Sequence, residues 1–389
     1  MKYLLKVALF FSYFLVPAQS INNLYFGTED TFEIMTWNIE SFPKNGQTTI
    51  DYTSQIIEAL DVDFIAIQEI NNETNFNQLK TDLTNYSGFI ESTDYDGLAF
   101  LYKTNTIQIN YVYRIFETSD YWNTFPRAPM VIDITYNNQQ LFIINNHLKC
   151  CGDGYLDSSN TDDEEYRRYQ ALNLLKSYID TNLANENVIL LGDLNDSLSD
   201  SESNNVFQNL IDDSSNYFFT DYNIANGVNT EWSYPSWPSH LDHILITNEL
   251  FDEFQLPSAT IETIKIDNYL SGGFSEYDEN VSDHRPVALK LTIDSNLEIN
   301  NLVKNESVNL TNYPNPFNYE TTFSFKNTTG NVEILIYNTL GQIVYTSPFI
   351  NGQTKFKWKS GNLLNGIYYA KLVLDKKEIA TRKILVSSN

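Results

Sequence analysis

The sequence predicts a layered α/β domain followed by a small all-β sandwich, and three observations carry this prediction. Short apolar runs alternate with amphipathic segments between Thr31 and Asp294, an order typical of stacked sheets and helices. From Asn309 to Asn389, strands alternate with Gly and Asn turns and no helical stretch occurs, which indicates a β-sandwich of about 80 residues. This last part carries nine Lys and Arg against four Asp and Glu, whereas the whole chain has a net charge of -26.

The chain starts with MKYLLKVALFFSYFLVPAQS, which has the three parts of a secretory signal peptide. Lys2 and Lys6 precede an apolar run over residues 7–16, and a cleavage region with small residues follows this run. The run is too short to span a bilayer, so a signal peptide over residues 1–18 is favoured over a membrane anchor. We therefore expect a secreted protein, extracellular or on the outer cell surface, with an N-terminal extension over residues 19–30.

Residues 31–295 form the predicted α/β domain. Its two expected helices cover residues 50–60 and 164–183, and in the second Leu172, Leu175, Ile179 and Leu183 recur on one face. The expected strands cover residues 63–69, 97–102, 130–136, 141–147, 187–193, 241–247 and 286–293.

A polar segment without glycine or sustained periodicity separates this domain from the tail, and it predicts a linker over residues 296–308. The tail then covers residues 309–389. The acidic charge of the chain repels nucleic acid and anionic membranes at long range. A phosphate ester substrate would therefore need local cations.

Acids, Asn and His follow several of the predicted strands at their ends. Examples are Asn38 with Glu40, Asp193 with Asn195, and Glu69. Residues two apart on a strand face the same side, so each pair aims both side chains into one cleft. A single such pair is more often a turn with its own hydrogen bonds, but the repeated pattern indicates a site.

In their order, the motifs TWNIE, QE, NNHL, GDLND, LDHIL and SDHRPV resemble those of the endonuclease/exonuclease/phosphatase superfamily, which includes deoxyribonuclease I. The resemblance implies a four-layered α/β sandwich with a divalent-metal phosphoesterase site at one end. Asn38, Glu69 and Asp283 would hold the metal, most simply Mg²⁺, with Mn²⁺ or Ca²⁺ as alternatives.

The same resemblance implies roles for the remaining site residues. His284 would be held by Asp242, and Asp193 and His284 are joint candidates for the general base. Asn195 would position the water and a phosphate oxygen. His147 would contact the phosphate or assist the leaving group, with Asp96 as its partner, unless Asp96 is an ordinary loop acid. Arg127 would bind phosphate, with a surface ion pair as the competing interpretation.

The tail motifs LTNYPNPFNYETTFSF, IYNTLGQIVYT and LNGIYYAKLVL resemble the C-terminal sorting domain of the type IX secretion system of Bacteroidetes. This resemblance implies that the tail is recognised by the secretion machinery and removed on export. A carbohydrate-binding or adhesion domain is the alternative.

The favoured function is a secreted, metal-dependent phosphodiesterase that cleaves DNA, or RNA, by in-line attack of water. A phosphoesterase acting on phospholipid head groups or phosphorylated polyols is the alternative, and a non-catalytic surface-binding module is a remote one. We expect a monomer without stable membrane insertion.

Two further features stand beside the motifs. Cys150 and Cys151 lie shortly after His147. Too few other ligands exist for a zinc site, so a vicinal disulfide and two free thiols remain the alternatives. The loop TEWSYPSWPSH carries Trp232, Tyr234 and Trp237, and packing on their own domain is favoured over a substrate-stacking role.

Overall fold

A computed structural model of the chain describes residues 20–91, 97–293, 310–315, 317–325, 330–338, 342–361, 363–374 and 377–386. The expected signal peptide, the expected linker and Asp96 lie outside the described residues. The chain divides into two compact units, Met1–Ser295 and Asn296–Asn389. Within the described residues, no helix combines the length and the apolar character needed to span a membrane.

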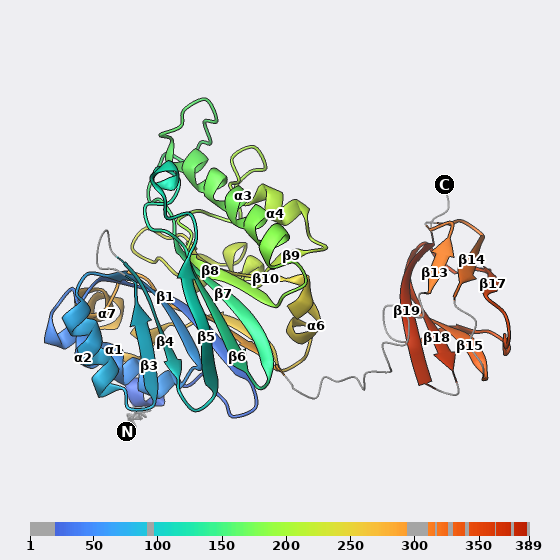
Figure 1. Cartoon of the computed structure of the whole chain (residues 1–389), viewed down its shortest axis with the longest axis horizontal. Coiled ribbons are helices and arrows are strands. Elements are labelled where there is room, and N and C mark those ends of the chain that lie inside the picture. Colours follow the sequence, from blue (N-terminus) through green and yellow to red (C-terminus); the bar gives the residue numbers. More distant parts are fainter. Residues whose placement is uncertain are drawn as a thin grey trace, which may run out of the picture. The chain divides into compact units, whose positions relative to one another are not determined.

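Two six-stranded sheets form the centre of the first unit (Figure 1). In spatial order, the first sheet consists of β11 (Thr260–Thr263), β12 (Val287–Leu291), β1 (Phe32–Phe42), β2 (Phe64–Ile70), β4 (Gly97–Lys103) and β3 (Tyr86–Ile90). The second consists of β5 (Ile107–Arg114), β6 (Met130–Tyr136), β7 (Gln139–His147), β8 (Val188–Asp193), β10 (Asp242–Thr247) and β9 (Tyr217–Phe219).

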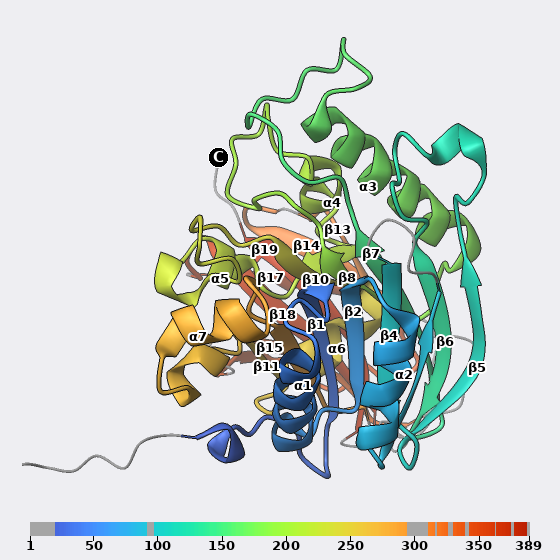
Figure 2. The same ribbon diagram turned by 90° about the vertical axis from the view of Figure 1, so that its left-hand side faces the viewer.

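Helices cover the outer face of each sheet, as Figures 1 and 2 show. The helices over the first sheet are α1 (Gln47–Leu60), α2 (Glu73–Asp82) and α7 (Gly273–Asn280), and those over the second are α3 (Glu164–Asn182) and α4 (Gln208–Asp212). The order of layers is therefore helix, sheet, sheet, helix, which confirms the expected four-layered α/β sandwich.

The remaining elements of this unit are short. They are α5 (Tyr222–Ala225) and α6 (Phe251–Phe254), and the 3-10 helices η1 (Ile21–Asn23), η2 (Ser119–Tyr121), η3 (Asn229–Glu231), η4 (Asn248–Leu250) and η5 (Ile266–Tyr269).

The alternation of side chains along each strand builds three cores. On β8, Ile189 and Leu191 face the core between the two sheets, whereas Val188 and Leu190 face α3. β8 is therefore apolar on both faces, which explains why it was recognisable as a continuous apolar run. The edge strand β5 is largely exposed and was not predicted.

The strand directions gather the polar strand ends at one edge of both sheets. β1 and β2 are parallel, as are β7 and β8, with His147 opposite Asp193. β10 and β12 run antiparallel to β8 and β1, so the start of each lies beside the end of its partner. Asp242, for example, pairs with Asp193.

The second unit is an all-β sandwich around one apolar core, as the sequence predicted. One sheet contains β13 (Thr311–Tyr313), β14 (Glu320–Ser324) and β17 (Lys355–Lys359). The other contains β16 (Ile343–Thr346), β15 (Val332–Tyr337), β18 (Gly366–Leu374) and β19 (Lys377–Val386).

Candidate active site

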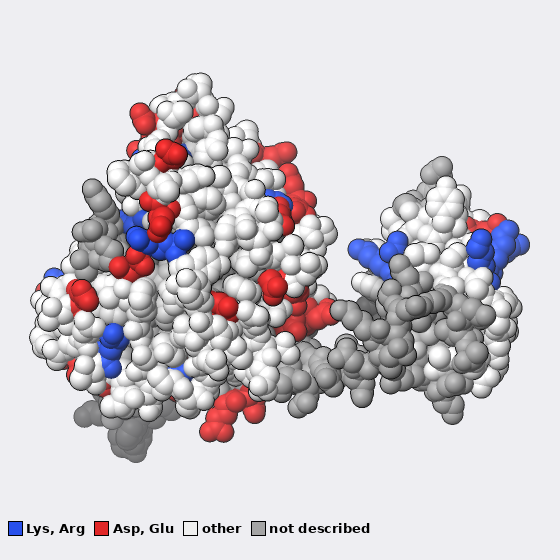
Figure 3. All heavy atoms as spheres, in the orientation of Figure 1, with Lys and Arg blue, Asp and Glu red and all other residues white. Residues whose placement is uncertain are grey.

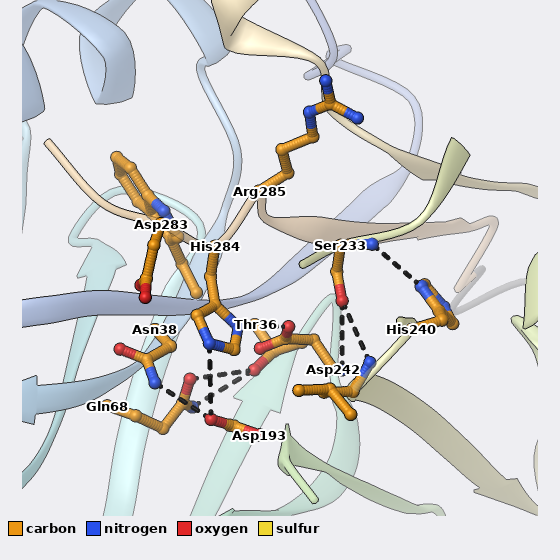
Figure 4. Close-up of polar contacts among 12 residues, drawn as sticks. Thr36, Asn38, Gln68, Asp193, Ser233, His240, Asp242, Asp283, His284 and Arg285 are labelled. Carbon is orange, nitrogen blue, oxygen red and sulfur yellow. Dashed lines mark hydrogen bonds and ion pairs between the residues drawn. The ribbon is translucent and has the colours of Figure 1, made fainter. Parts of the chain in front are cut away.

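Asp193, at the end of β8, lies at the centre of the polar cluster (Figure 4). Its Oδ2 accepts a hydrogen bond of 2.9 Å from Nδ2 of Asn38, and it lies 3.6 Å from Nε2 of His147 and 3.8 Å from Nε2 of His284. Burial, together with the nearby carboxylates of Asp242 and Glu69, raises the pKa of Asp193 to about 7, although His284 and Asn38 oppose this rise.

Backbone geometry at two strand ends aims the side chains into this cluster. Gly192 has φ +144°, and a Cβ there would lie 2.0 Å from the carbonyl oxygen of Asn146, so only glycine lets β8 approach β7 just before Asp193. Glu69 has φ +67° at a register shift of β2. Such an irregularity turns a side chain out of the regular alternation.

His284 lies just before β12 and is held by Asp242. Nδ1 of His284 lies 2.7 Å from Oδ2 of Asp242, and both side chains are buried. This contact leaves Nε2 of His284 facing Asp193. Burial alone would lower the pKa of His284, but the carboxylates of Asp242 and Asp193 outweigh it and raise the pKa to about 10.

The three residues expected to hold a metal come from β1, β2 and the segment before β12. Nδ2 of Asn38 donates to Glu69 at 3.0 Å, and the backbone N–H of Asp283 donates to Glu40 at 3.0 Å. The Asp283 carboxylate accepts no hydrogen bond from the part of the chain that the structure describes. Burial and the charges of Glu40 and Glu69 raise its pKa to about 6, although His284 and Lys44 oppose this.

This donor set fits a hard divalent cation. It offers carboxylate and amide oxygens, and the repulsion between Asp283 and the neighbouring carboxylates is what a bound cation would offset. Asp193, Asp242 and His284 also present ligand atoms within 4.8 Å of one another. Because Nδ1 of His284 is already bonded to Asp242, we interpret that group as a proton-handling set rather than a metal site.

His147 is buried at the end of β7, with Nε2 3.9 Å from Glu69. Burial, the charge of Arg127 and that of His284 lower its pKa, so the ring is neutral. Its Nδ1 has no hydrogen-bond partner among the described residues; the expected partner, Asp96, lies outside them.

Asn195 differs in detail from the expectation. Its backbone N–H donates to Asp193 at 3.1 Å, but its side-chain amide donates to the carbonyl of Leu148 at 3.3 Å. In this conformation, the Asn195 side chain ties the loop after β8 to the loop after β7.

Arg168, on α3, holds the same two loops together and was not singled out in the sequence. Its guanidinium donates to the carbonyls of Lys149 and Cys151, each at 2.7 Å, and to the Asp196 carboxylate at 2.8 Å. Cys150 and Cys151 are exposed free thiols whose Sγ atoms lie 2.8 Å apart.

A buried polar network under the site joins the two sheets. Nε2 of Gln68, on β2, donates to Asn145 of β7 at 2.8 Å and also contacts Thr36 of β1 (Figure 4). Asn145 in turn donates to the carbonyls of Ile67 and Ala99. Asn145 and His147 share one face of β7, a spacing that could have marked Asn145 in the sequence.

The other two histidines, His240 and His243, form a buried cluster with Asp221. Oδ2 of Asp221 lies 3.1 Å from Nε2 of His240 and 2.6 Å from Nδ1 of His243. Nδ1 of His240 accepts from Ser233, and Nε2 of His243 contacts the carbonyl of Asp196. Every ring nitrogen is hydrogen-bonded, as expected of histidines with a structural role.

The comparisons with known proteins agree with this geometry. Residues 35–284 match the model of the Endonuclease/Exonuclease/phosphatase family, and residues 311–387 match that of the secretion system C-terminal sorting domain. No curated protein sequence matches the chain significantly.

Several solved structures are similar to this chain. TDP2 from D. rerio, complexed with a single-strand DNA product, is 14% identical, with a TM-score of 0.52, over 68% of this chain and 100% of that one. A humanized D. rerio TDP2 has the same identity and coverage, with a TM-score of 0.51. An endonuclease/exonuclease/phosphatase protein from Bacteroides vulgatus is 13% identical, with a TM-score of 0.47, over 68% and 99%. The family model covers more than half of the chain, so the chain belongs to the endonuclease/exonuclease/phosphatase family of metal-dependent phosphoric ester hydrolases.

Proposed function

We propose that this protein is an exported nuclease that hydrolyses phosphodiester bonds of DNA with Mg²⁺. The observation that carries the proposal is the convergence of Asn38, His147 and His284 on Oδ2 of Asp193, at 2.9, 3.6 and 3.8 Å. The two longer distances exceed a hydrogen bond, so these polar atoms can bind a water or a phosphate oxygen that lies beside them.

Asn38, Glu69 and Asp283 would hold the metal ion. When bound, it would neutralise phosphate charge and the charge that develops on the leaving oxygen. The chain itself would orient the reactants: Asn38 fixes Asp193 by its hydrogen bond, and Glu40 fixes the backbone at Asp283.

Asp193 and His284 are the two candidates for the base that takes the proton of the attacking water. Because the pKa of His284 is raised to about 10 and that of Asp193 to about 7, Asp193 is favoured as the base near neutral pH, with His284 as its protonated partner. The Asp242 carboxylate holds the ring of His284 with Nε2 toward Asp193. The neutral ring of His147 would contact a phosphate oxygen from the other side, and Arg127, whose charge acts on His147, would add the cation that an acidic chain needs near a phosphate. Positioning and electrostatic stabilisation would then supply most of the rate.

Two observations bear on DNA as the substrate. TDP2, which shares the fold, was solved with a single-strand DNA product. On the face in Figure 3, Lys and Arg of the first unit occur in small groups beside Asp and Glu, whereas a protein that grips duplex DNA tightly presents an extended basic surface. The bound product of TDP2 favours a single strand as the substrate.

Digestion of linear and circular DNA by the purified protein tests the proposal. We expect cleavage with Mg²⁺ and none with a chelator, and cutting of the circle would identify an endonuclease. Intact DNA under all conditions, together with hydrolysis of a phospholipid head group or a polyol phosphate, would overturn the DNA assignment while keeping the phosphoesterase chemistry.

The sorting domain indicates export and secretion or attachment to the cell surface. We propose that residues 1–18 are removed first and that residues 309–389 then direct type IX export, with residues 296–308 as the linker. Deletion of residues 309–389 in a host with this system should leave the enzyme inside the cell and active. Unchanged export of the shortened chain would contradict this proposal.

A further inference from the structure

A hairpin between η3 and β10 packs Tyr234 against His284 and carries an exposed tryptophan, Trp237, in its turn. The backbones of Tyr234 and Ser239 exchange two hydrogen bonds, of 3.0 and 3.1 Å, and Trp237 lies in the turn between them. Trp237 is 80% exposed, whereas Trp232 is half-buried, with its indole N–H bonded to the carbonyl of Ile224. Only part of this aromatic loop therefore packs on its own domain.

Ser233 ties the base of the hairpin to the catalytic strand ends (Figure 4). Its hydroxyl oxygen accepts hydrogen bonds from the backbone N–H groups of Leu241 and Asp242, at 3.1 and 3.3 Å. Its own N–H donates to Nδ1 of His240, and its carbonyl accepts from the N–H of Arg285 at 2.7 Å. Hydrogen bonds therefore join the base of the hairpin to the backbone of Asp242 and to Arg285, the residue after His284.

Arg285 fixes the entry into the hairpin. Its guanidinium donates to both oxygens of Asp267, at 2.8 and 2.7 Å, and to the carbonyl of Thr230 at 3.1 Å. The side chain is buried, and a bidentate pair of this kind holds one geometry. The loop therefore enters the hairpin in a defined position.

Tyr234 places the hairpin directly against the site. Its ring centroid lies 4.8 Å from that of His284, with 40° between the ring planes. Burial and the charges of Asp283 and Glu40 raise the pKa of the Tyr234 hydroxyl. Trp237 is three residues further on, which keeps its Cα within about 11 Å of that of Tyr234.

We propose that Trp237 stacks on a nucleobase that flanks the scissile phosphate. This inference rests on the proposed nuclease function. An exposed aromatic ring gains stacking energy with every base, because each base has a π-face. The hydrogen bonds of the hairpin backbone hold the position from which the Trp237 ring would reach the base. Such a ring also binds nucleic acid without positive charge, which suits a chain with a net charge of -26.

Kinetics on two matched substrates test the stacking role. One substrate is a single-stranded oligonucleotide. The other has the same length and the same sugar-phosphate backbone but lacks its bases. With the first, Trp237→Ala should raise KM by about 5- to 100-fold, the range of a stacked base removed by alanine substitution. The effect on kcat should be small, and Trp237→Phe should restore most of the binding. With the abasic substrate, the difference between Trp237→Ala and wild type should disappear.

Tyr25→Ala is the control for loss of an exposed aromatic ring. Tyr25 is 70% exposed, and the N–H of its neighbour Phe26 donates to the carbonyl of Leu60, the last residue of α1. Leu60 precedes the start of β2, whereas Glu69 lies near the end of that strand. Equal KM values for Trp237→Ala and Tyr25→Ala on the oligonucleotide would overturn the stacking role, as would an equal loss on both substrates. If wild type cleaves neither substrate, the proposed function itself fails, so the two failures are distinguishable.

Discussion

Nδ1 of His284 and Oδ2 of Asp242 lie 2.7 Å apart, and neither side chain is more than 7% exposed. The two residues are 42 positions apart in the chain, and they meet because β10 and the segment before β12 reach the same edge of the two sheets. The contact fixes which ring nitrogen of His284 faces Asp193. It therefore determines the proton chemistry of the site.

Replacing either member of this pair should impair turnover. His284→Ala should lower kcat by about 100- to 10,000-fold, the usual contribution of a general acid or base. Asp242→Asn, which removes only the group that orients the ring, should cost about 10- to 100-fold. Initial rates on DNA measure both, with circular dichroism as the check on folding. Full turnover by His284→Ala would refute this role.

Glu69→Gln should weaken metal binding while the fold remains intact. Removing one carboxylate charge from a hard-cation site should raise the Mg²⁺ concentration for half-maximal activity at least about tenfold. Isothermal titration with Mg²⁺ provides a readout that does not depend on activity. Glu73→Gln, at an exposed position at the start of α2, is the matched control and should bind Mg²⁺ like wild type. Equal affinities for the two variants would rule out Glu69 as a ligand.

The buried pair of Asp221 and His243 should make stability depend on pH. Burial opposes both charges, but the attraction between them lowers the pKa of Asp221 and raises that of His243. The contribution of Asp221 to the free energy of unfolding is present above the pKa of Asp221 in the unfolded chain. It is lost as the pH falls through the pKa of Asp221 in the folded protein. The His243 contribution is present below its unfolded pKa and is lost as pH rises through the folded value. Both are complete between about pH 4 and 6.5.

Asp221→Asn should therefore lower the free energy of unfolding by about 3–5 kcal/mol, because it leaves a buried imidazolium unpaired. The loss should be largest near pH 5 and should shrink as the pH rises well above 6.5, where His243 in the variant is neutral. Urea denaturation at pH 5 and pH 9 measures it. A loss that is equal at both pH values would exclude the charged pair as the cause.

Cys150 and Cys151 should form a vicinal disulfide in the exported protein. Their Sγ atoms lie 2.8 Å apart on an exposed loop, and the Arg168 guanidinium holds the carbonyl of Cys151. Because an oxidising compartment lets such a bond persist, mass spectrometry after alkylation should find no labelled cysteine without reductant and two with it. Two labelled cysteines in the unreduced protein would end this hypothesis.

The central strands could be predicted because their signal is local. β4 and β8 are largely apolar on both faces, and each stands out as a short run between polar segments. By contrast, β5 and β3 lie at sheet edges with polar, exposed residues, so their pairing depends on neighbours that are distant in the chain. The strength of the local apolar pattern also separates the helices. α1 has several buried residues and was recognised, whereas the buried residues of α2 are only Phe76 and Leu79, and this helix was not recognised.

The site residues could be named in the sequence because their motifs are short and ordered, but their contacts could not. Asn195 belongs to GDLND, yet its amide turns to the carbonyl of Leu148. Tyr234 packs on the ring of His284, although for this loop the sequence favoured aromatic side chains that only pack on their own domain. Arg168 carries no motif and still holds the loops after β7 and β8.

By itself, the sequence determined the two domains by their patterning, the family by its motifs, and the acidic and amide side chains available to a metal ion. These properties follow from residue types and short spacings, which need no knowledge of distant neighbours. Only the tertiary structure decided that Asp193 stands between Asn38, His147 and His284, and that a hairpin packs Tyr234 against His284. Those relationships arise where separate strands end at one sheet edge, and their geometry depends on packing across the whole domain.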